Sequence, residues 1–223
     1  MSISEKINSL RKELPSYVKI VAVSKTRSPE EILEAYHAGQ MIFGENKAQE
    51  LLSKQPLLPP DIHWHFLGHL QTNKVKQIIP FIRLIHSLDS IKLLRIINKE
   101  AILINRTIDC LLQFHIATEE TKFGLDLMEA TELIQTINKE KINNVAIKGV
   151  MGMASFTDDQ QLIRKEFQTL RSYFTQLKQE FYPDDNEFSE LSFGMSGDYL
   201  LAIQEGSTMI RIGTAIFGER NYH

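Results

Sequence analysis

The sequence predicts an α/β protein with a single-domain (β/α)8 TIM barrel, and three observations support this fold class. Eight short apolar runs alternate with amphipathic segments along the 223 residues, which is typical of successive βαβ units. The runs are apolar at nearly every position, as expected of parallel strands covered on both faces. No linker rich in proline or glycine and no internal repeat divides the chain, so we expect one domain over residues 1–223. A doubly wound open sheet is the alternative with the same order of elements.

Each element follows from its local pattern. The strands are expected at residues 18–24, 41–44, 63–68, 84–88, 109–116, 145–152, 188–194 and 209–213. Helical patterns cover about 4–13, 29–38, 46–54, 72–79, 127–140, 160–180 and 198–205, and another begins at 89–90. Ser28, Pro29 and Glu31 form the capping-box pattern of a helix start, and Gly39 suits the position after its end. The segment at about 4–13 precedes the first strand and adds an extra N-terminal helix to the barrel.

Composition excludes several classes of function. The chain is 43% hydrophobic and 24% charged with a formal net charge of -3, which lacks the basic excess of a general nucleic-acid surface. Its single cysteine, Cys110, excludes an internal disulfide and is typical of a reducing compartment. The N-terminal segment has no apolar core of a signal peptide, and no apolar run approaches the roughly 20 residues of a membrane span. We therefore expect a cytoplasmic protein that binds neither nucleic acid nor membrane.

Functional residues of such a barrel gather where strands end and loops begin. The seventh and eighth strands lead into "GMSGD" (194–198) and "RIGT" (211–214), and the corresponding loops of many barrels bind a phosphate. Ser196 offers a hydroxyl, Gly197 lets an anion approach the backbone, and Gly213 and Thr214 lie alongside. Asp198 is expected to cap or orient the loop rather than touch an anion. Ordinary turn glycines with a capping residue are the alternative interpretation.

Lys25 follows the first strand, which neighbours the eighth in a closed barrel. A partly desolvated lysine amine is a nucleophile for aldehydes. An amine beside an anion site points to one ligand that carries both a carbonyl and a phosphate, and pyridoxal 5′-phosphate (PLP) has both groups. A surface lysine at a strand end is the alternative.

Several segments resemble one known family. They are "AVSKT" (22–26), "FGEN" (43–46), "WHFLGHLQTNK" (64–74), "HSLDS" (86–90), "LSFGMSGD" (191–198) and "GSTMIRIGTAIFG" (206–218). Together they are similar to the pyridoxal phosphate homeostasis protein family, which resembles the N-terminal barrel domain of alanine racemase. The resemblance implies PLP held as an imine on Lys25, with Arg211 facing the ring nitrogen. It implies further cofactor contacts from Asn46, His65, Ser196, Gly197, Gly213 and Thr214. The segments "EETKFGLDL" (119–127) and "KGVMGMASF" (148–156) depart from the family pattern, which leaves the contacts of those loops open.

The resemblance also implies a role in intracellular PLP homeostasis, in which the protein binds, buffers and delivers the cofactor with little or no turnover of its own. PLP-dependent apo-enzymes would be its recipients, and the chain would be a monomer or weak dimer. A cationic Arg211 at the ring nitrogen disfavours ring protonation and weakens the electron sink that PLP catalysis needs. Racemases also use a tyrosine from an additional domain; this chain ends five residues after Gly218, so we expect that domain to be missing.

Three other functions remain as alternatives. The first is a small PLP-dependent racemase or related enzyme, for which Tyr199 is the tyrosine nearest the expected pocket. The second is a metal enzyme that uses His63, His65 and His69 of "HWHFLGH" as ligands. The third is a binding module for nucleic acid or protein, based on the short lysine-rich segments "TNKVK" (72–76) and "INKEK" (137–141).

Overall fold

The computed structural model describes residues 1–118 and 123–219. Its eight parallel strands close into a barrel in sequence order, with β1 paired to β8 through Val21 and Arg211. The strands are β1 Lys19–Val23, β2 Ile42–Glu45, β3 His63–Phe66, β4 Ile82–Leu88, β5 Ile108–Phe114, β6 Val145–Gly152, β7 Glu190–Met195 and β8 Met209–Ile212. The predicted barrel is therefore confirmed, and the open sheet is excluded.

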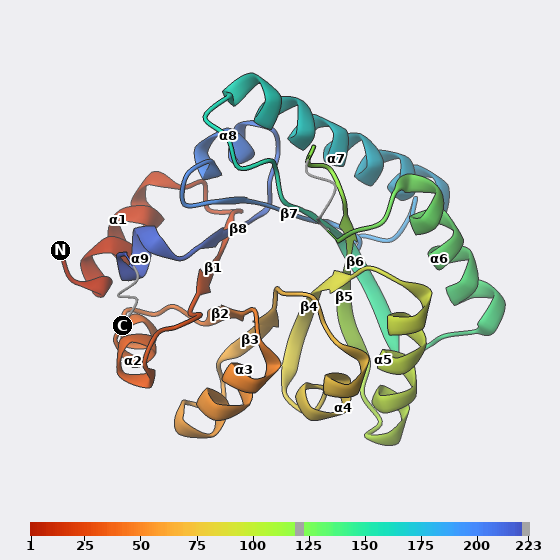
Figure 1. Cartoon of the computed structure of the whole chain (residues 1–223), viewed down its shortest axis with the longest axis horizontal. Helices are drawn as coiled ribbons and strands as arrows, with labels where there is room; N and C mark the ends of the chain where they lie inside the picture. Colours follow the sequence, from red (N-terminus) through yellow and green to blue (C-terminus); the bar gives the residue numbers. More distant parts are fainter. Residues whose placement is uncertain (119–122, 220–223) are drawn as a thin grey trace.

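Helices surround the strands (Figure 1). They are α1 Ile3–Glu13, α2 Pro29–His37, α3 Ala48–Lys54, α4 Val75–Ile78, α5 Ile91–Leu103, α6 Leu127–Glu140, α7 Gln160–Phe181, α8 Tyr199–Gln204 and α9 Thr214–Phe217, with 3-10 turns η1 Gln55–Leu57 and η2 Thr72–Lys74. The capping box at Ser28 forms as predicted, and Gly39 has a positive φ of 83° after α2. Helix α9 was not predicted. Residues 119–122 of the "EETKFGLDL" segment lie outside the described residues.

Two apolar layers stabilise the barrel. A large outer cluster fills the space between strands and helices, and it includes Cys110, whose thiol pKa is raised by burial. A smaller inner cluster consists of Val21, Leu67, Leu84, Leu111, Met151 and Met209. The rest of the barrel interior holds buried polar side chains, among them His65, His86, Ser192 and Arg211.

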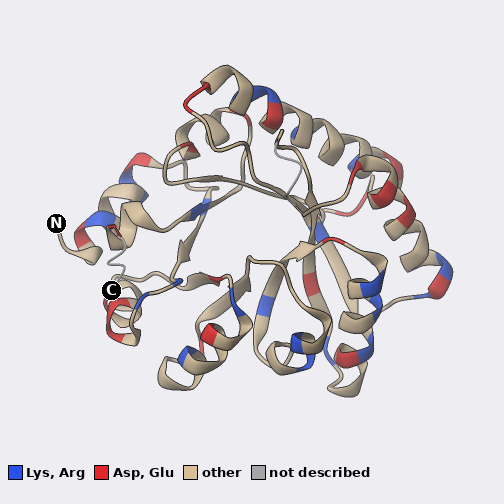
Figure 2. Ribbon diagram, viewed as in Figure 1, with Lys and Arg blue, Asp and Glu red and all other residues tan. Residues whose placement is uncertain are grey.

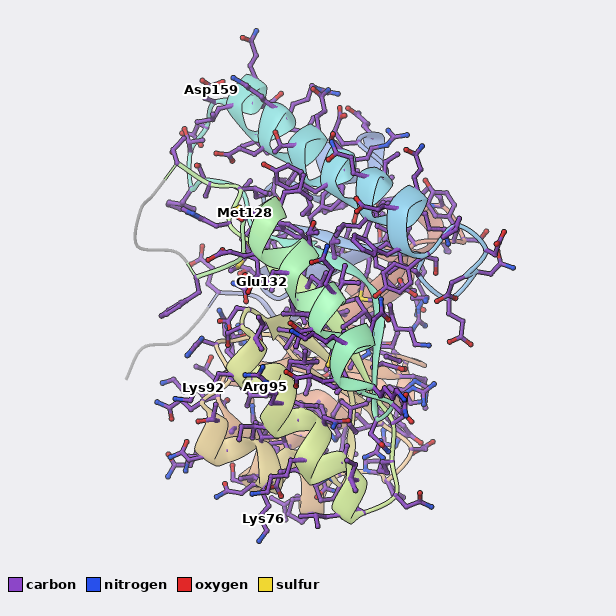
Figure 3. The ribbon with its side chains drawn as sticks, turned by 90° about the vertical axis from the view of Figure 1, so that its right-hand side faces the viewer. Lys76, Lys92, Arg95, Met128, Glu132 and Asp159 are labelled. Carbon is purple, nitrogen blue, oxygen red and sulfur yellow. The ribbon has the colours of Figure 1, made fainter. Side chains whose placement is uncertain are left out.

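The outer surface mixes charges of both signs. Lys and Arg alternate with Asp and Glu over the surrounding helices (Figure 2). Figure 3 shows Lys92 and Arg95 on α5 and Met128 and Glu132 on α6 pointing away from the barrel. Arg95 Nε donates to Glu140 Oε2 at 3.0 Å, which joins these neighbouring helices. In the part of the chain that the structure describes, every helix is too short or too polar to cross a lipid bilayer.

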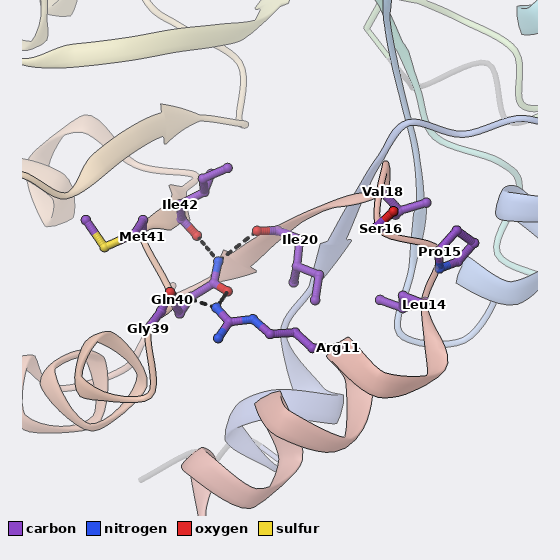
Figure 4. Close-up of a pocket in the computed structure, with 10 residues that line it drawn as sticks. All are labelled: Arg11, Leu14, Pro15, Ser16, Val18, Ile20, Gly39, Gln40, Met41 and Ile42. Carbon is purple, nitrogen blue, oxygen red and sulfur yellow. Dashed lines mark hydrogen bonds between the residues drawn. The ribbon is translucent and has the colours of Figure 1, made fainter.

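A cavity of about 400 Å³ lies at the amino end of β1 and β2, and its Arg11 and Gln40 side chains bond within the protein (Figure 4). Arg11 Nη1 and Nη2 donate to the carbonyls of Ala38 and Gly39 at 2.7 and 2.8 Å. Gln40 Nε2 donates to the carbonyls of Ile20 and Ile42, both at 2.7 Å. These bonds fasten α1 to the end of α2 and to the barrel, so this cavity is part of the framework.

Candidate functional site

A cavity of about 480 Å³ lies at the carboxyl ends of the strands. Seven of the eight predicted site residues line it, namely Lys25, Asn46, Ser196, Gly197, Arg211, Gly213 and Thr214. They come from the loops after β1, β2 and β7 and from β8 and the segment that follows it. The structure therefore brings together residues that are up to 189 positions apart in the sequence (25 to 214).

A strained turn follows Lys25. Thr26 has a φ of 65°, which is uncommon for a residue with a branched side chain. Its N–H donates to Glu50 Oε1 at 2.5 Å, so a side chain of α3 holds the turn in place. This strained residue lies next to the predicted nucleophile, where it sets the direction in which the chain leaves β1.

A buried ion cluster supports the same turn. Lys54 Nζ donates to the Ser24 carbonyl at 2.8 Å, to Glu45 Oε1 at 2.8 Å and to Glu50 Oε1 at 2.6 Å. Ser24 Oγ also donates to Glu45 Oε1 at 2.7 Å. Burial raises the pKa of Glu45, while Lys54 opposes that shift. Removing one member of such a cluster leaves a buried charge uncompensated, so the cluster holds the end of β1 rigidly.

Asn46 brings an unsatisfied acceptor to the cavity. Its Oδ1 is buried and has no hydrogen-bond partner among the described residues. The loop that carries Asn46 packs closely against Gly68, where an added Cβ would lie 2.2 Å from the Asn46 carbonyl oxygen. A buried polar atom without a partner costs free energy unless a ligand or water satisfies it.

The loops after β7 and β8 present hydrogen-bond donors. Ser196 Oγ accepts from the N–H groups of Gly213 and Ala215 at 3.3 and 3.4 Å, which leaves its own proton available to a ligand. Within the described chain, the N–H groups of Ser196 and Gly197 donate to no other residue. An added Cβ at Gly197 would meet nothing within 4 Å, so the loop surface here is open. Such a set of donors suits a phosphate or another bulky anion.

Asp198 orients this loop, as predicted, by accepting from the Met195 N–H at 2.5 Å. Its side chain makes no capping bond to α8. Burial raises the pKa of Asp198, while the Met195 N–H and Arg211 oppose that shift. Because α8 has only six residues, the loop N–H groups rather than a helix dipole account for the anion-binding character.

Arg211 places a buried cation at the wall of the cavity. Its Nη1 donates to the Ser192 carbonyl at 2.7 Å and to Ser192 Oγ at 2.8 Å, and its Nη2 donates to the Gly152 carbonyl at 2.9 Å. Burial lowers the pKa of Arg211 to about 10, and Asp198 opposes the shift, so the guanidinium stays charged at neutral pH. A guanidinium has five N–H donors, and these three bonds leave two for a ligand.

The structure does not bring His65 to this cavity, which corrects the expectation from the sequence. His65 is 4% exposed and lines a different cavity at the amino ends of the strands, together with His63. Both histidines share the inward face of β3, as their spacing predicts, while Trp64 packs in the outer cluster. The side chain of His65 lies toward the opposite end of the barrel and is not part of the lining of the main cavity.

The loop after β6, whose contacts the sequence left open, supplies lining residues that were not among the predicted site residues, namely Ser155, Phe156, Thr157 and Asp158. Ser155 is fixed by Glu166 of α7, whose Oε2 accepts from the Ser155 N–H at 2.7 Å and whose Oε1 accepts from its Oγ at 2.6 Å. The position of this loop at the end of a barrel strand was the available signal. Its sequence carries no phosphate-binding pattern that would have identified it.

The metal-site alternative finds no support in the geometry. His69 lies at the other end of β3 from His63, where its Nδ1 is 2.9 Å from Asp89 Oδ2. Across residues 1–118 and 123–219, no three His, Cys, Asp or Glu side chains converge as ligands of one metal ion. The "HWHFLGH" segment therefore distributes its histidines over two ends of the barrel.

Comparisons with known proteins agree with this architecture. The model of the family described as alanine racemase, N-terminal domain, matches residues 1–221. A pyridoxal phosphate homeostasis protein of Aquifex aeolicus is 39% identical over 205 residues, covering 92% of this chain and 88% of the relative. The human protein of the same name is 38% identical over 215 residues, covering 92% and 77%.

Solved structures give the same result. PipY of Synechococcus elongatus, solved with PLP bound, is 36% identical with a TM-score of 0.86, and the match covers 97% of this chain and 100% of PipY. Alanine racemase of Bartonella henselae is 17% identical with a TM-score of 0.69 and matches over 99% of this chain and 60% of the racemase, which shows a shared fold. The chain belongs to the alanine racemase N-terminal domain family and, within it, to the pyridoxal phosphate homeostasis proteins.

Proposed function

We propose that the protein binds PLP in the cavity at the carboxyl ends of its strands and holds it as an imine on Lys25. The neutral Nζ of Lys25 adds to the aldehyde carbon, water leaves, and a C=N bond joins the lysine to the cofactor. The observation that carries the proposal is that Lys25 and the unpaired donors of the 196–197 loop line one cavity. One molecule with an aldehyde and a phosphate matches both.

The remaining groups of the cavity fit the other parts of PLP. The N–H groups and hydroxyl of the Ser196–Gly197 loop, with Gly213 and Thr214 beside it, would hold the phosphate. Arg211 would donate to the pyridine nitrogen through one of its two remaining N–H groups. The orphaned Oδ1 of buried Asn46 would accept a hydrogen bond from a ligand hydroxyl. Asn46 Oδ1 and the N–H groups of Ser196 and Gly197 have no partner within the described chain, and they support these assignments.

We infer a role in PLP homeostasis, in which the protein binds, buffers and delivers the cofactor with little turnover. Bound PLP supplies an electron sink that depends on a protonated ring nitrogen. Arg211 is a permanent donor at that position and disfavours ring protonation. No tyrosine of the described chain lines the cavity, including Tyr199, so a second base of the racemase kind is missing there. The two relatives named pyridoxal phosphate homeostasis protein support this role, PipY was solved with PLP bound, and nothing favours a racemase.

PLP-dependent apo-enzymes are the proposed recipients of the cofactor, and the proposed active form is a monomer or weak dimer in the cytoplasm. The reversible imine supports delivery, since hydrolysis returns free PLP and the lysine amine. The buried, unpaired Cys110 agrees with a reducing compartment.

A spectroscopic titration tests the proposal. Purified protein titrated with PLP is expected to develop the visible band of an imine, with saturation at one cofactor per chain. Ser196→Ala removes a phosphate donor and is expected to weaken binding about tenfold, since one hydrogen bond to a charged group contributes roughly 1.5 kcal/mol.

Ser207→Ala is the matched control. Ser207 Oγ bonds only framework carbonyls, those of Leu191, Phe193 and Met209. This variant is expected to lower thermal stability and leave the PLP affinity unchanged. Absence of the band in the wild-type protein, or equal affinities for wild type and Ser196→Ala, contradicts the proposal.

A further inference from the structure

A chain of hydrogen bonds crosses the barrel interior behind the main cavity. Arg211 Nη1 lies 2.8 Å from Ser192 Oγ, Ser192 Oγ lies 3.1 Å from His86 Nδ1, and His86 Nε2 lies 3.0 Å from His65 Nδ1. The four residues come from β8, β7, β4 and β3, so the chain spans the barrel from one side to the other. All four side chains are buried.

The far end of this chain reaches a second cavity, of about 390 Å³, at the amino ends of the strands. His65 lines it together with Lys19, His63 and Arg83. The chain therefore connects the wall of the proposed PLP cavity with the opposite mouth of the barrel.

The chemistry of the donors fixes the direction of each bond. A guanidinium only donates, so Ser192 Oγ accepts from Arg211. Within the described chain, the hydroxyl proton of Ser192 then has one acceptor, His86 Nδ1. With Nδ1 accepting, neutral His86 carries its proton on Nε2 and donates it to His65 Nδ1. His65 must then carry its own proton on Nε2.

Both imidazoles are neutral in this environment, as the directed chain requires. Burial lowers the pKa of His65 to about 3, and electrostatic interactions with His63, Lys19 and Arg83 act in the same direction. Burial also holds the pKa of His86 well below its ordinary value, and His65 and Arg211 add to the shift. Asp198 is the acidic group that faces Arg211 at the other end.

We propose that Ser192, His86 and His65 are positioning residues that fix the Arg211 guanidinium, from behind, in the orientation that serves the pyridine nitrogen of PLP. The inference rests on the proposed function, because that function assigns Arg211 to the ring. Ser192 accepts through both its carbonyl and its hydroxyl, and the two histidines keep the hydroxyl lone pair aimed at Arg211. Without them, the Ser192 hydroxyl rotates, and the guanidinium loses one of its three anchors.

The first test needs no cofactor. Nitrogen-15 NMR of the histidines in the full chain at neutral pH reports charge and tautomer directly. The expected result is two neutral imidazoles, His65 and His86, each with its proton on Nε2. A proton on Nδ1 of His86, or a charged ring at either residue, would contradict the proposed directions of the hydrogen bonds. This outcome does not depend on whether the protein binds PLP.

The second test measures PLP binding and the absorption spectrum of the loaded protein. His86→Met removes the acceptor of the Ser192 proton, and it is expected to weaken PLP binding about tenfold and shift the visible band. His86→Asn, which restores an acceptor near the Nδ1 position, is expected to recover most of both. If His86 had only a structural role, His86→Met and His86→Asn of equal stability would have the same absorption spectrum.

Ser87→Ala is the matched control, because Ser87 follows His86 on β4 and its buried Oγ has no partner within the described chain. It is expected to leave affinity and spectrum unchanged. An unchanged affinity and spectrum in folded His86→Met overturns the positioning role. If His86→Met fails to fold, the tautomers that NMR reports for His65 and His86 in the wild-type protein decide whether the proposal stands. Loss of PLP binding by the wild type itself would refute the proposed function and leave the NMR result standing.

Discussion

The two ends of the barrel use charged side chains in opposite ways. At the amino ends of the strands, Lys19 pairs with Glu190, and Lys148 pairs with Glu187 and lies 3.7 Å from Asp109. At the carboxyl ends, the buried Arg211 is held by carbonyl and hydroxyl oxygens instead of a carboxylate. At the amino ends Lys19 and Lys148 are paired with carboxylates, whereas at the carboxyl ends Arg211 makes no ion pair with a described residue and keeps N–H donors for a ligand.

The difference extends to other polar groups. At the amino ends of β1 and β2, the side chains of Arg11 and Gln40 bond each other and backbone carbonyls. Around the main cavity, Asn46 Oδ1 and the N–H groups of the Ser196–Gly197 loop have no partner within the described chain. A buried acceptor without a partner is costly, and Asn46 Oδ1 lies beside open N–H donors at this end, which marks where a ligand belongs.

The largest expected effect is that of Lys25, which follows β1, and Lys19 at the start of β1 is its control. Lys25→Ala removes the proposed nucleophile and is expected to abolish the visible imine band completely. Lys19→Ala, at the other end of β1, removes a surface ion pair and is expected to keep the band, since exposed pairs contribute at most about 1 kcal/mol. Visible absorption after PLP loading measures both. A band that persists in Lys25→Ala would mean that Lys25 does not form the imine and that the carboxyl end of β1 has no special role in binding.

Two glycines separate ligand binding from folding. Gly197→Ala adds a methyl group in open space, so the unloaded protein is expected to keep its stability within about 0.5 kcal/mol. The methyl would obstruct the phosphate, and PLP affinity is expected to fall about thirtyfold, or about 2 kcal/mol.

Gly206→Ala is the matched control, because Gly206 has a φ of 96° and lies away from the cavity. It is expected to cost about 1 kcal/mol of stability with no change in affinity. Chemical unfolding and PLP titration measure the two quantities. Equal PLP affinity in Gly197→Ala and wild type would show that the loop does not approach the phosphate.

The buried histidines predict how stability depends on pH. The pKa of His65 is about 3 in the folded protein and about 6.5 in the unfolded chain. Below pH 6.5 the unfolded state therefore binds a proton that the folded state does not, and stability falls as the pH falls. Between pH 7 and 5 this term amounts to about 2 kcal/mol. His65→Asn is expected to lose that much pH dependence in urea unfolding, and an unaltered slope would contradict a buried neutral His65.

The smallest effect concerns the turn after Lys25. Thr26→Gly relieves the positive φ and is expected to change stability by less than about 1 kcal/mol, since the added freedom of the unfolded chain offsets part of the gain. It also loosens the turn that directs Lys25, so imine formation is expected to slow. Stopped-flow absorption at the band measures this rate. A rate equal to that of the wild type would mean that Thr26 does not position Lys25.

The sequence predicted the barrel and most of its elements because apolar runs and caps are local signals. The capping box at Ser28 and the helix at Leu127–Glu140 illustrate this. Helix α9 was missed because its four residues, Thr214–Phe217, lie between two glycines and resemble a loop. Short helices depend on tertiary packing more than on propensity.

The residues at the carboxyl ends of the strands could be predicted from the sequence, because the barrel fold brings those ends together. His65 was assigned to the wrong cavity because alternation along β3 tells which side chains face the barrel interior, but not toward which mouth they lean. The links from Ser192 to His86 and Arg211 join strands far apart in sequence. Only the closed barrel brings them together, so no local pattern could reveal them.

The most direct test of the account is the location of the covalent bond. The protein is loaded with PLP, reduced with borohydride, digested and analysed by peptide mass spectrometry. The account predicts one reduced pyridoxyl group, on Lys25, with Lys19 and Lys54 unmodified. A label on another lysine while Lys25 remains unmodified would contradict it.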